Sequence, residues 1–216
     1  MKNWLLKSFK DNKGLIIFLL LMSVFRSAVA DWYTVPTGSM KPTILEGDRI
    51  LANKMAYDVR IPFTHTSLYK MSDPQRGDII IFESKVADER LIKRVIGVPG
   101  DVIELNKNKL SINGKSLSYQ SISSNGLVDD KQENLLGIKH KIRTDKTNSD
   151  YASFDTVTVP NGHYLVLGDN RDHSADSRMI GFVPRNEIIG RSKQVIMSLN
   201  YDNHYLPRSN RFFQDL

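Results

Sequence analysis

The apolar residues of this chain follow two different patterns. Residues 15–25 form an almost unbroken apolar run, which predicts a helix directed to a membrane. After Arg26 the apolar residues occur in short or alternating runs, as in 48–52, 78–82, 91–98 and 163–167. Glycines, prolines and Asn-Gly pairs separate these runs, as is typical of strands joined by turns. We therefore predict a mainly β fold behind one N-terminal apolar helix.

Three features of the later chain add to the main β pattern. Asn113-Gly114 lies between two alternating runs and predicts a two-residue hairpin with a type I′ turn. Residues 106–158 are rich in Ser, Asn, Lys and Asp and hold few large apolar residues, so we interpret them as a small insertion outside the main core. The tail, 200–216, mixes aromatic residues with arginines and is expected to pack on the core or to contact lipid.

The charges around the apolar run predict its orientation in a membrane. Four lysines precede the run with only one acidic residue to offset them: Lys2, Lys7, Lys10, Lys13 and Asp11. Basic residues stay on the cytoplasmic side, which predicts a cytoplasmic N-terminus and an exported remainder. A helix over 14–30 would be about 25 Å long, slightly short of a hydrocarbon core of about 30 Å. We predict that 1–30 is a cytoplasmic stub and single-pass anchor and that 31–216 is an extracytoplasmic β domain.

The same residues also match a cleavable signal peptide. A basic start and an apolar middle are followed by Ala28-Val29-Ala30, a small-x-small pattern, and then by Asp31. On this alternative the mature chain begins at Asp31 and has no anchor.

Composition narrows the possible partners and chemistry. The chain has 216 residues, no cysteine, a net charge of +6 and a pI of about 9.4. The lack of cysteine excludes disulfides, thiolate metal sites and a cysteine nucleophile. The positive charge suits anionic lipid or nucleic acid. Because the lysines cluster before the apolar run, we expect membrane lipid and not nucleic acid to be the partner.

Ser39 is the candidate nucleophile, in a loop bracketed by Pro36 and Pro42. A serine needs a base and a stabilised oxyanion to act at neutral pH. The five histidines share no spacing with Ser39 and no G-x-S-x-G elbow surrounds it, so a histidine-based triad has no support in the sequence. Gly-Ser in a turn is also common without catalysis.

Lys93 is the better candidate base. Strand alternation places it on the face that carries Leu91 and Val95, where burial disfavours the charged ammonium. A pKa lowered to about 7 or 8 would let the neutral amine accept the serine proton. Arg94 points to the opposite face and is expected to be structural. The alternative is an ordinary strand lysine with its ammonium in solvent.

Four stretches in this order resemble the bacterial type I signal peptidases: 36–43, 46–51, 76–82 leading into 92–101, and 168–178. The resemblance covers about 14–191. It implies a membrane-anchored serine protease with a Ser-Lys dyad, in which Ser39 is the nucleophile and Lys93 the general base. It also implies an oxyanion hole made by the Ser39 backbone N–H and the Thr37 hydroxyl.

The resemblance also assigns supporting and substrate-binding residues. Ser174 matches a hydroxyl that orients the lysine, and Asp176 and Arg178 match a structural pair near the site. His173 replaces an asparagine common in relatives. Core packing is the alternative role for the residues that the resemblance places around the substrate: Val35, Pro36, Met40, Ile44, Leu91 and Ile92.

The implied substrates are exported preproteins, read as an extended strand with small residues at the first and third positions before the cut. No cofactor or metal is expected. Asp169, Asp172 and Asp176 lack the turn glycine and terminal glutamate of an EF-hand. Apolar residues within 55–71 fit either lipid or the core. The predicted location is the inner, cytoplasmic membrane.

Three other functions remain open at this point. An exported β domain could bind peptides or lipids without catalysis, leaving Ser39 and Lys93 incidental. A specialised peptidase could process pilin or conjugation proteins. A self-cleaving repressor-type protein would use the same Ser-Lys chemistry, but it needs a soluble DNA-binding domain where this chain has an apolar segment.

Overall fold

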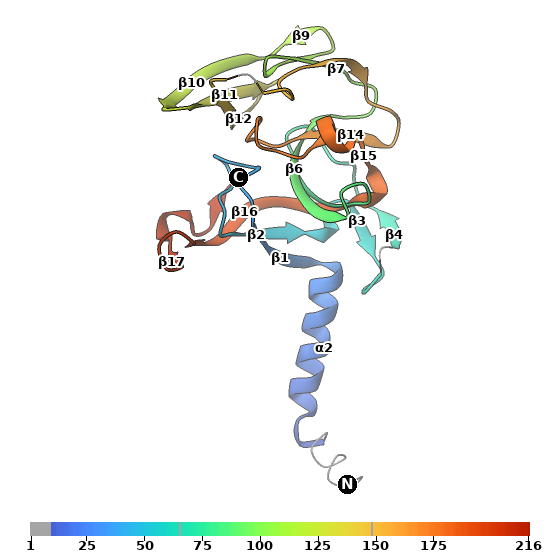
Figure 1. The fold of residues 1–216 in the computed structure, drawn as a ribbon. Coiled ribbons are helices and arrows are strands. Elements are labelled where there is room, and N and C mark those ends of the chain that lie inside the picture. Colours follow the sequence, from blue (N-terminus) through green and yellow to red (C-terminus); the bar gives the residue numbers. More distant parts are fainter. Residues whose placement is uncertain (1–9, 65, 148) are drawn as a thin grey trace.

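A helix stands apart from a β-rich body in the computed structural model of the chain (Figure 1). The structure describes residues 10–64, 66–147 and 149–216. Residues 1–9, which hold most of the predicted cytoplasmic stub, lie outside the described residues. The body consists of one large sheet near the helix and smaller sheets at the far end.

The helix, α2 (Lys13–Ala28), buries none of its residues. Its large apolar side chains are exposed, among them Leu20 at 62% and Leu21 at 65%. It ends two residues before the predicted boundary at Ala30, because Ala30 already pairs with Asn53 in the first strand ladder. No helix within the described part of the chain combines the length and apolar character needed to cross a membrane. The predicted transmembrane span therefore stays a prediction.

The main body is a nine-stranded antiparallel sheet among the described residues. Its path runs β1-β2-β16-β5-β6-β14-β15, and β17 and β18 pair with β16. The strands are β1 (Ala30–Thr34), β2 (Asp48–Asn53), β5 (Ile79–Ser84), β6 (Glu89–Gly97), β14 (His163–Leu167), β15 (Val183–Pro184), β16 (Ile188–Asn200), β17 (Leu206–Pro207) and β18 (Gln214–Asp215). The runs predicted at 48–52, 78–82, 91–98 and 163–167 are confirmed as β2, β5, β6 and β14.

Strand β5 is buried on both faces and separates two parts of the core. Ile79 and Ile81 point into one apolar cluster, and Ile80 and Phe82 into another. This alternation follows from the two-residue period of a strand. A nearly continuous apolar run is what a central strand with both faces covered requires.

The remaining strands form three small sheets. A hairpin near the helix pairs β3 (Asp58–Arg60) with β4 (Ser67–Lys70). The two sheets at the far end have the orders β13-β7-β8-β9 and β10-β11-β12. Their strands are β7 (Val102–Asn106), β8 (Lys109–Ile112), β9 (Lys115–Ser116), β10 (Ser118–Asn125), β11 (Val128–Leu135), β12 (Ile138–Asp145) and β13 (Phe154–Thr158). Short helical turns complete the fold: η1 (Lys54–Ala56), α3 (Ser177–Ile180), η2 (Arg185–Glu187) and η3 (Ser209–Arg211).

The predicted hairpin at Asn113-Gly114 is confirmed. Ile112 pairs with Lys115, and both turn residues have positive φ, 51° at Asn113 and 76° at Gly114. Positive φ at both central positions is the signature of a type I′ turn.

The predicted insertion, 106–158, forms sheets separate from the main one, and we call this part the cap. It is better packed than its polar composition suggests. Leu110, Ile112 and Leu135 are at most 1% exposed and share an apolar cluster with Ile96 and Leu165 of the main sheet. The cap therefore rests on the main sheet through an apolar interface.

The C-terminal tail packs on the core. Arg211 forms a bidentate pair with buried Asp48, with a Nε–Oδ1 distance of 3.0 Å. Leu216 packs against the cluster that holds Ile79 and Ile81. Tyr205 and Phe213 stay exposed, at 63% and 67%.

Candidate active site

Ser39 lies in the loop that joins β1 to β2. The Lys41 N–H donates to the Gly38 carbonyl at 3.0 Å and the Ile44 N–H donates to the Met40 carbonyl at 2.9 Å, which makes the loop a compact turn. Met40 and Ile44 are 1% and 0% exposed and fix the loop to the core. Ser39 itself is half-buried and lines a cavity.

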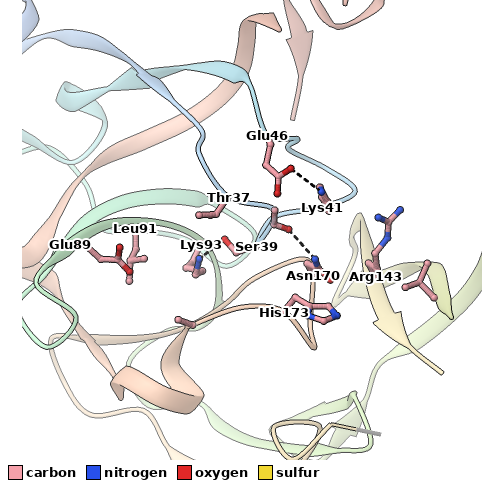
Figure 2. A pocket seen from close by; sticks show the side chains of 13 residues that line it. Thr37, Ser39, Lys41, Glu46, Glu89, Leu91, Lys93, Arg143, Asn170 and His173 are labelled. Carbon is pink, nitrogen blue, oxygen red and sulfur yellow. Dashed lines mark hydrogen bonds and ion pairs between the residues drawn. The ribbon is translucent and has the colours of Figure 1, made fainter. Parts of the chain in front are cut away.

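Lys93 approaches Ser39 from strand β6. Its Nζ donates a hydrogen bond to Ser39 Oγ at 2.7 Å (Figure 2). Lys93 is only 2% exposed, and Leu91 and Val95 of the same strand face belong to one buried apolar cluster. The predicted burial of this lysine on an apolar strand face is confirmed.

Burial lowers the pKa of Lys93 to about 8 from an ordinary value of 10.5. The main cause is loss of solvation, which penalises the charged ammonium. Asp176, Glu89 and Asp169 oppose the shift because they favour the cation. The predicted direction is confirmed, and a pKa of about 8 leaves roughly one tenth of the amine neutral at pH 7.

The loop that follows β14 holds the serine loop in place. The Asn170 N–H donates to the Ser39 carbonyl at 3.1 Å, and its side-chain Nδ2 donates to the Gly38 carbonyl at 3.0 Å. Gly168 lets its own loop approach the serine loop closely. A Cβ at this position would lie 2.5 Å from the Ser39 carbonyl oxygen and 2.2 Å from Ser174 Oγ. Asn170 and Gly168 therefore fix the position of Ser39, the candidate nucleophile.

Two buried ion pairs fix the same loop. Arg94 donates to both carboxylate oxygens of Asp169, at 2.8 and 2.7 Å, and Arg178 does the same to Asp176, at 2.8 Å for each oxygen. The expected structural role of Arg94 and the Asp176–Arg178 pairing agree with this geometry. Asp176 also accepts a hydrogen bond from the Gly168 N–H at 2.9 Å. The Asp176–Arg178 pair therefore also holds Gly168 in place beside the serine loop.

Ser174 lies beside the site. Its Oγ is buried and has no hydrogen-bond partner among the described residues. The predicted contact with Lys93 is thus not made in this arrangement, and the orienting role stays a prediction.

The cavity around the dyad has a volume of about 520 Å³. It runs between the serine loop, strand β6, the cap and the loop after β14 (Figure 2). The lining residues are Thr37, Gly38, Ser39, Lys41, Glu46, Glu89, Leu91, Lys93, Val128, Arg143, Asn170, His173 and Ala175. An opening of this size can hold a short stretch of peptide.

Of the six residues predicted to bind substrate, only Leu91 lines the cavity. Val35, Met40 and Ile44 are at most 3% exposed and form part of the core, and Ile92 packs against the same cluster. Pro36 is exposed beside the serine loop. Val35, Met40 and Ile44 thus have the core-packing role that was the alternative to substrate binding.

Several cavity residues were not assigned from the sequence. Asn170 lies within 168–178, one of the four stretches that resemble the family, but the resemblance assigns it no role. Its position in that stretch is the one sequence signal that marks it. Val128 and Arg143 reach the cavity from cap strands β11 and β12, and no local pattern marks them. His173 also lines the cavity and pairs with Asp145 at 2.9 Å. In the described part of the chain, no group of three His, Cys, Asp or Glu residues is placed to hold a metal ion.

Comparison with known proteins identifies the family. A family model described as signal peptidase, peptidase S26, matches residues 10–197. A signal peptidase I of Pseudomonas aeruginosa is 36% identical over 202 residues, which cover 86% of this chain and 71% of that protein. One from Buchnera aphidicola is 30% identical and covers 94% of this chain and 79% of its own length. A crystal structure of an Enterococcus faecalis signal peptidase I is 34% identical, covers 56% of this chain and 98% of its own, and has a TM-score of 0.38.

A buried lysine that is hydrogen-bonded to a candidate nucleophilic serine, in a cavity that can hold a short peptide, is an arrangement that suits a peptidase. The chain belongs to the signal peptidase I family, peptidase S26. It is accordingly a serine peptidase that cleaves signal peptides from preproteins, and the family is membrane-associated.

Proposed function

We propose that Ser39 is the nucleophile and Lys93 the general base of this peptidase. The observation that carries the proposal is the 2.7 Å hydrogen bond between Ser39 Oγ and the buried amine, whose pKa is lowered to about 8. Neutral Lys93 takes the serine proton as Oγ attacks the scissile carbonyl. The protonated amine then gives that proton to the leaving amine, and water hydrolyses the acyl ester.

The oxyanion is stabilised by the Ser39 backbone N–H and the Thr37 hydroxyl. Thr37 is exposed and lines the cavity on the nucleophile side. Within the described residues, the Ser39 N–H donates to no protein group, so it can donate to the oxyanion instead. Donors fixed in advance around developing negative charge are among the largest contributions to catalysis.

The substrate lies in the cavity as an extended strand, with small residues at the first and third positions before the cut. Leu91 bounds the space next to the dyad, and the cap lines the far side through Val128 and Arg143. The preference for small residues such as alanine at these two positions is the one that the family implies for its preprotein substrates.

Residues 1–30 anchor the enzyme in the inner membrane, with residues 31–216 on the extracytoplasmic side. Support comes from α2, which buries none of its residues and exposes most of its large apolar side chains. The β3–β4 hairpin meets this helix, since the Phe63 N–H donates to Ser27 Oγ at 2.6 Å, and it exposes 70% of Phe63 and 38% of Ile61. These apolar groups lie at the lipid surface. Anchoring raises the local concentration of substrates that emerge there.

Cleavage of a preprotein with an Ala-x-Ala site, in detergent micelles, tests this function. Mass spectrometry of the products should show one cut after the second alanine with the wild-type enzyme and none with Ser39→Ala. Replacing either alanine of the substrate by leucine should stop cleavage. A cut at another position, or full activity of Ser39→Ala, would refute the proposal.

A further inference from the structure

Asn170 lies between two residues that are anchored to different parts of the fold. On one side, Asp169 forms its bidentate pair with Arg94 on strand β6 of the main sheet. On the other side, Arg171 donates to both carboxylate oxygens of Glu133 on cap strand β11, at 3.0 and 2.6 Å. The residue that holds the serine loop is therefore tied both to the main sheet and to the cap.

The Glu133–Arg171 pair is fully buried, with 0% of either side chain exposed. Burial alone would raise the pKa of the Glu133 carboxyl, but Arg171 and the neighbouring His140 hold this pKa well below its ordinary value. The pair is therefore ionic at neutral pH. A bidentate pair fixes orientation as well as distance, and removal of one partner leaves a buried charge without a counter-charge.

The cap backbone reinforces this link. Arg143 on β12 donates its N–H to the Asp169 carbonyl at 2.8 Å and accepts from the Arg171 N–H at 2.9 Å, so it forms a parallel bridge to Asn170. Strand β12 in turn pairs with β11, the strand that carries Glu133. A shift of these cap strands would therefore move Asn170.

Asn170 passes such a shift on to the dyad. Its N–H donates to the Ser39 carbonyl at 3.1 Å, and its Nδ2 donates to the Gly38 carbonyl at 3.0 Å (Figure 2). Ser39 Oγ lies 2.7 Å from Lys93 Nζ, a distance that a small movement of the serine loop would lengthen. Displacements of about 1 Å between reacting groups can lower a rate about 100-fold.

We propose that Glu133 is a positioning residue for the peptidase reaction, which acts through Arg171 and Asn170 to fix the hydroxyl of Ser39. The cap is then a part of the catalytic framework as well as a wall of the cavity. This inference rests on the proposed function, in which Ser39 is the nucleophile. Glu133 does not line the cavity, so its loss should lower kcat and leave KM nearly unchanged.

Three variants test this role: Glu133→Gln, Arg171→Met and the double variant that combines them. Asp58→Asn is the matched control, because it also removes the charge of a carboxylate that pairs with an arginine. Asp58 is 7% exposed, lies 2.8 Å from Arg185 and does not line the cavity. The kcat and KM are measured on one preprotein in detergent, and thermal unfolding gives the Tm of each variant.

Glu133→Gln should lower kcat about 10- to 100-fold, because the serine loop loses its link to the cap. Its Tm should fall by about 10 °C, since Arg171 is left buried without a charged partner. Asp58→Asn should lower the Tm but leave kcat and KM at the wild-type values. A folded Glu133→Gln enzyme with the wild-type kcat would overturn the inference.

The double variant separates positioning from stability. It buries no unpaired charge, so its Tm should return most of the way to the wild-type value. Its kcat should stay as low as that of Glu133→Gln, because Asn170 still lacks the ion pair that ties it to the cap. A kcat that recovers together with the Tm would refute the positioning role, and this measurement decides the matter even where Glu133→Gln alone does not fold.

Wild type and Ser39→Ala in the same assay keep the two proposals apart. If wild type cleaves, Ser39→Ala does not, and Glu133→Gln has the wild-type kcat, this inference fails and the proposed function stands. If Ser39→Ala cleaves as fast as wild type, the proposed function fails and the positioning role of Glu133 fails with it.

Discussion

Lys93 Nζ lies 2.7 Å from Ser39 Oγ, although the two residues are 54 positions apart in the chain. Strand β6 carries the lysine and the β1–β2 loop carries the serine, while Asn170 from a third segment bonds to the serine backbone. On the proposed mechanism this buried amine controls the protonation of Ser39, and its burial also affects the stability of the fold.

The activity should depend on pH through Lys93. Its pKa is lowered to about 8, and only the neutral amine can accept the serine proton. The kcat/KM for a preprotein should therefore rise about tenfold per pH unit below this pKa and level off above it. Initial rates measured across this range check the prediction. A rate that is independent of pH below 8 would contradict it.

Lys93→Met should stabilise the protein while removing its base. Because the pKa in the folded state lies below that in the unfolded state, the native ammonium is destabilised. This penalty is full below pH 8, shrinks as pH rises from about 8 to about 10.5, and vanishes above that. At pH 7 we expect the free energy of unfolding to rise by about 1 to 3 kcal/mol. Urea unfolding at pH 7 and pH 10 measures it, and an equal gain at both pH values would contradict this explanation.

Thr37→Val should lower kcat by about 100-fold or more, because the oxyanion loses one donor. The KM should change little, since Thr37 is exposed and does not hold the fold together. Thr37→Ser keeps the hydroxyl and should retain most of the activity. The kinetic constants of both variants on one preprotein check this, and equal losses in the two would argue for a steric role instead.

Gly168→Ala should displace the nucleophile. The new methyl group would lie 2.5 Å from the Ser39 carbonyl oxygen and 2.2 Å from Ser174 Oγ, so both contacts are too short and the serine loop must shift. We expect a loss of stability of about 1 to 3 kcal/mol and a larger fall in kcat. Gly14→Ala is a suitable control, because a Cβ there has no atom within 4 Å. Thermal unfolding and cleavage rates are measured for both variants. A fully active Gly168→Ala enzyme would show that the contact between Gly168 and the serine loop tolerates a methyl group.

Much of the main sheet could be predicted because its signals are local. The two-residue period identified β6 and the apolar face of Lys93, and the Asn-Gly pair identified the turn between β8 and β9. Ser39 and Lys93, the proposed nucleophile and base, are predicted from the order of four motifs, and the fold brings these two distant residues together.

The walls of the cavity could not be predicted in the same way. Val128 and Arg143 reach it only because the cap packs on the main sheet, which no short pattern records. Met40 and Ile44 lie close to Ser39 in the sequence but point into the core. Position near a motif therefore does not determine which way a side chain points.

The most direct test of the Ser-Lys dyad is the single-turnover rate at which Lys93→Met cleaves a preprotein at pH 9, compared with wild type and Ser39→Ala. At this pH wild-type Lys93 is mostly neutral, so the enzyme is in its active form. We predict that both variants are folded and at least about 1,000-fold slower than wild type. A folded Lys93→Met enzyme that cleaves at the wild-type rate would show that another group takes the serine proton.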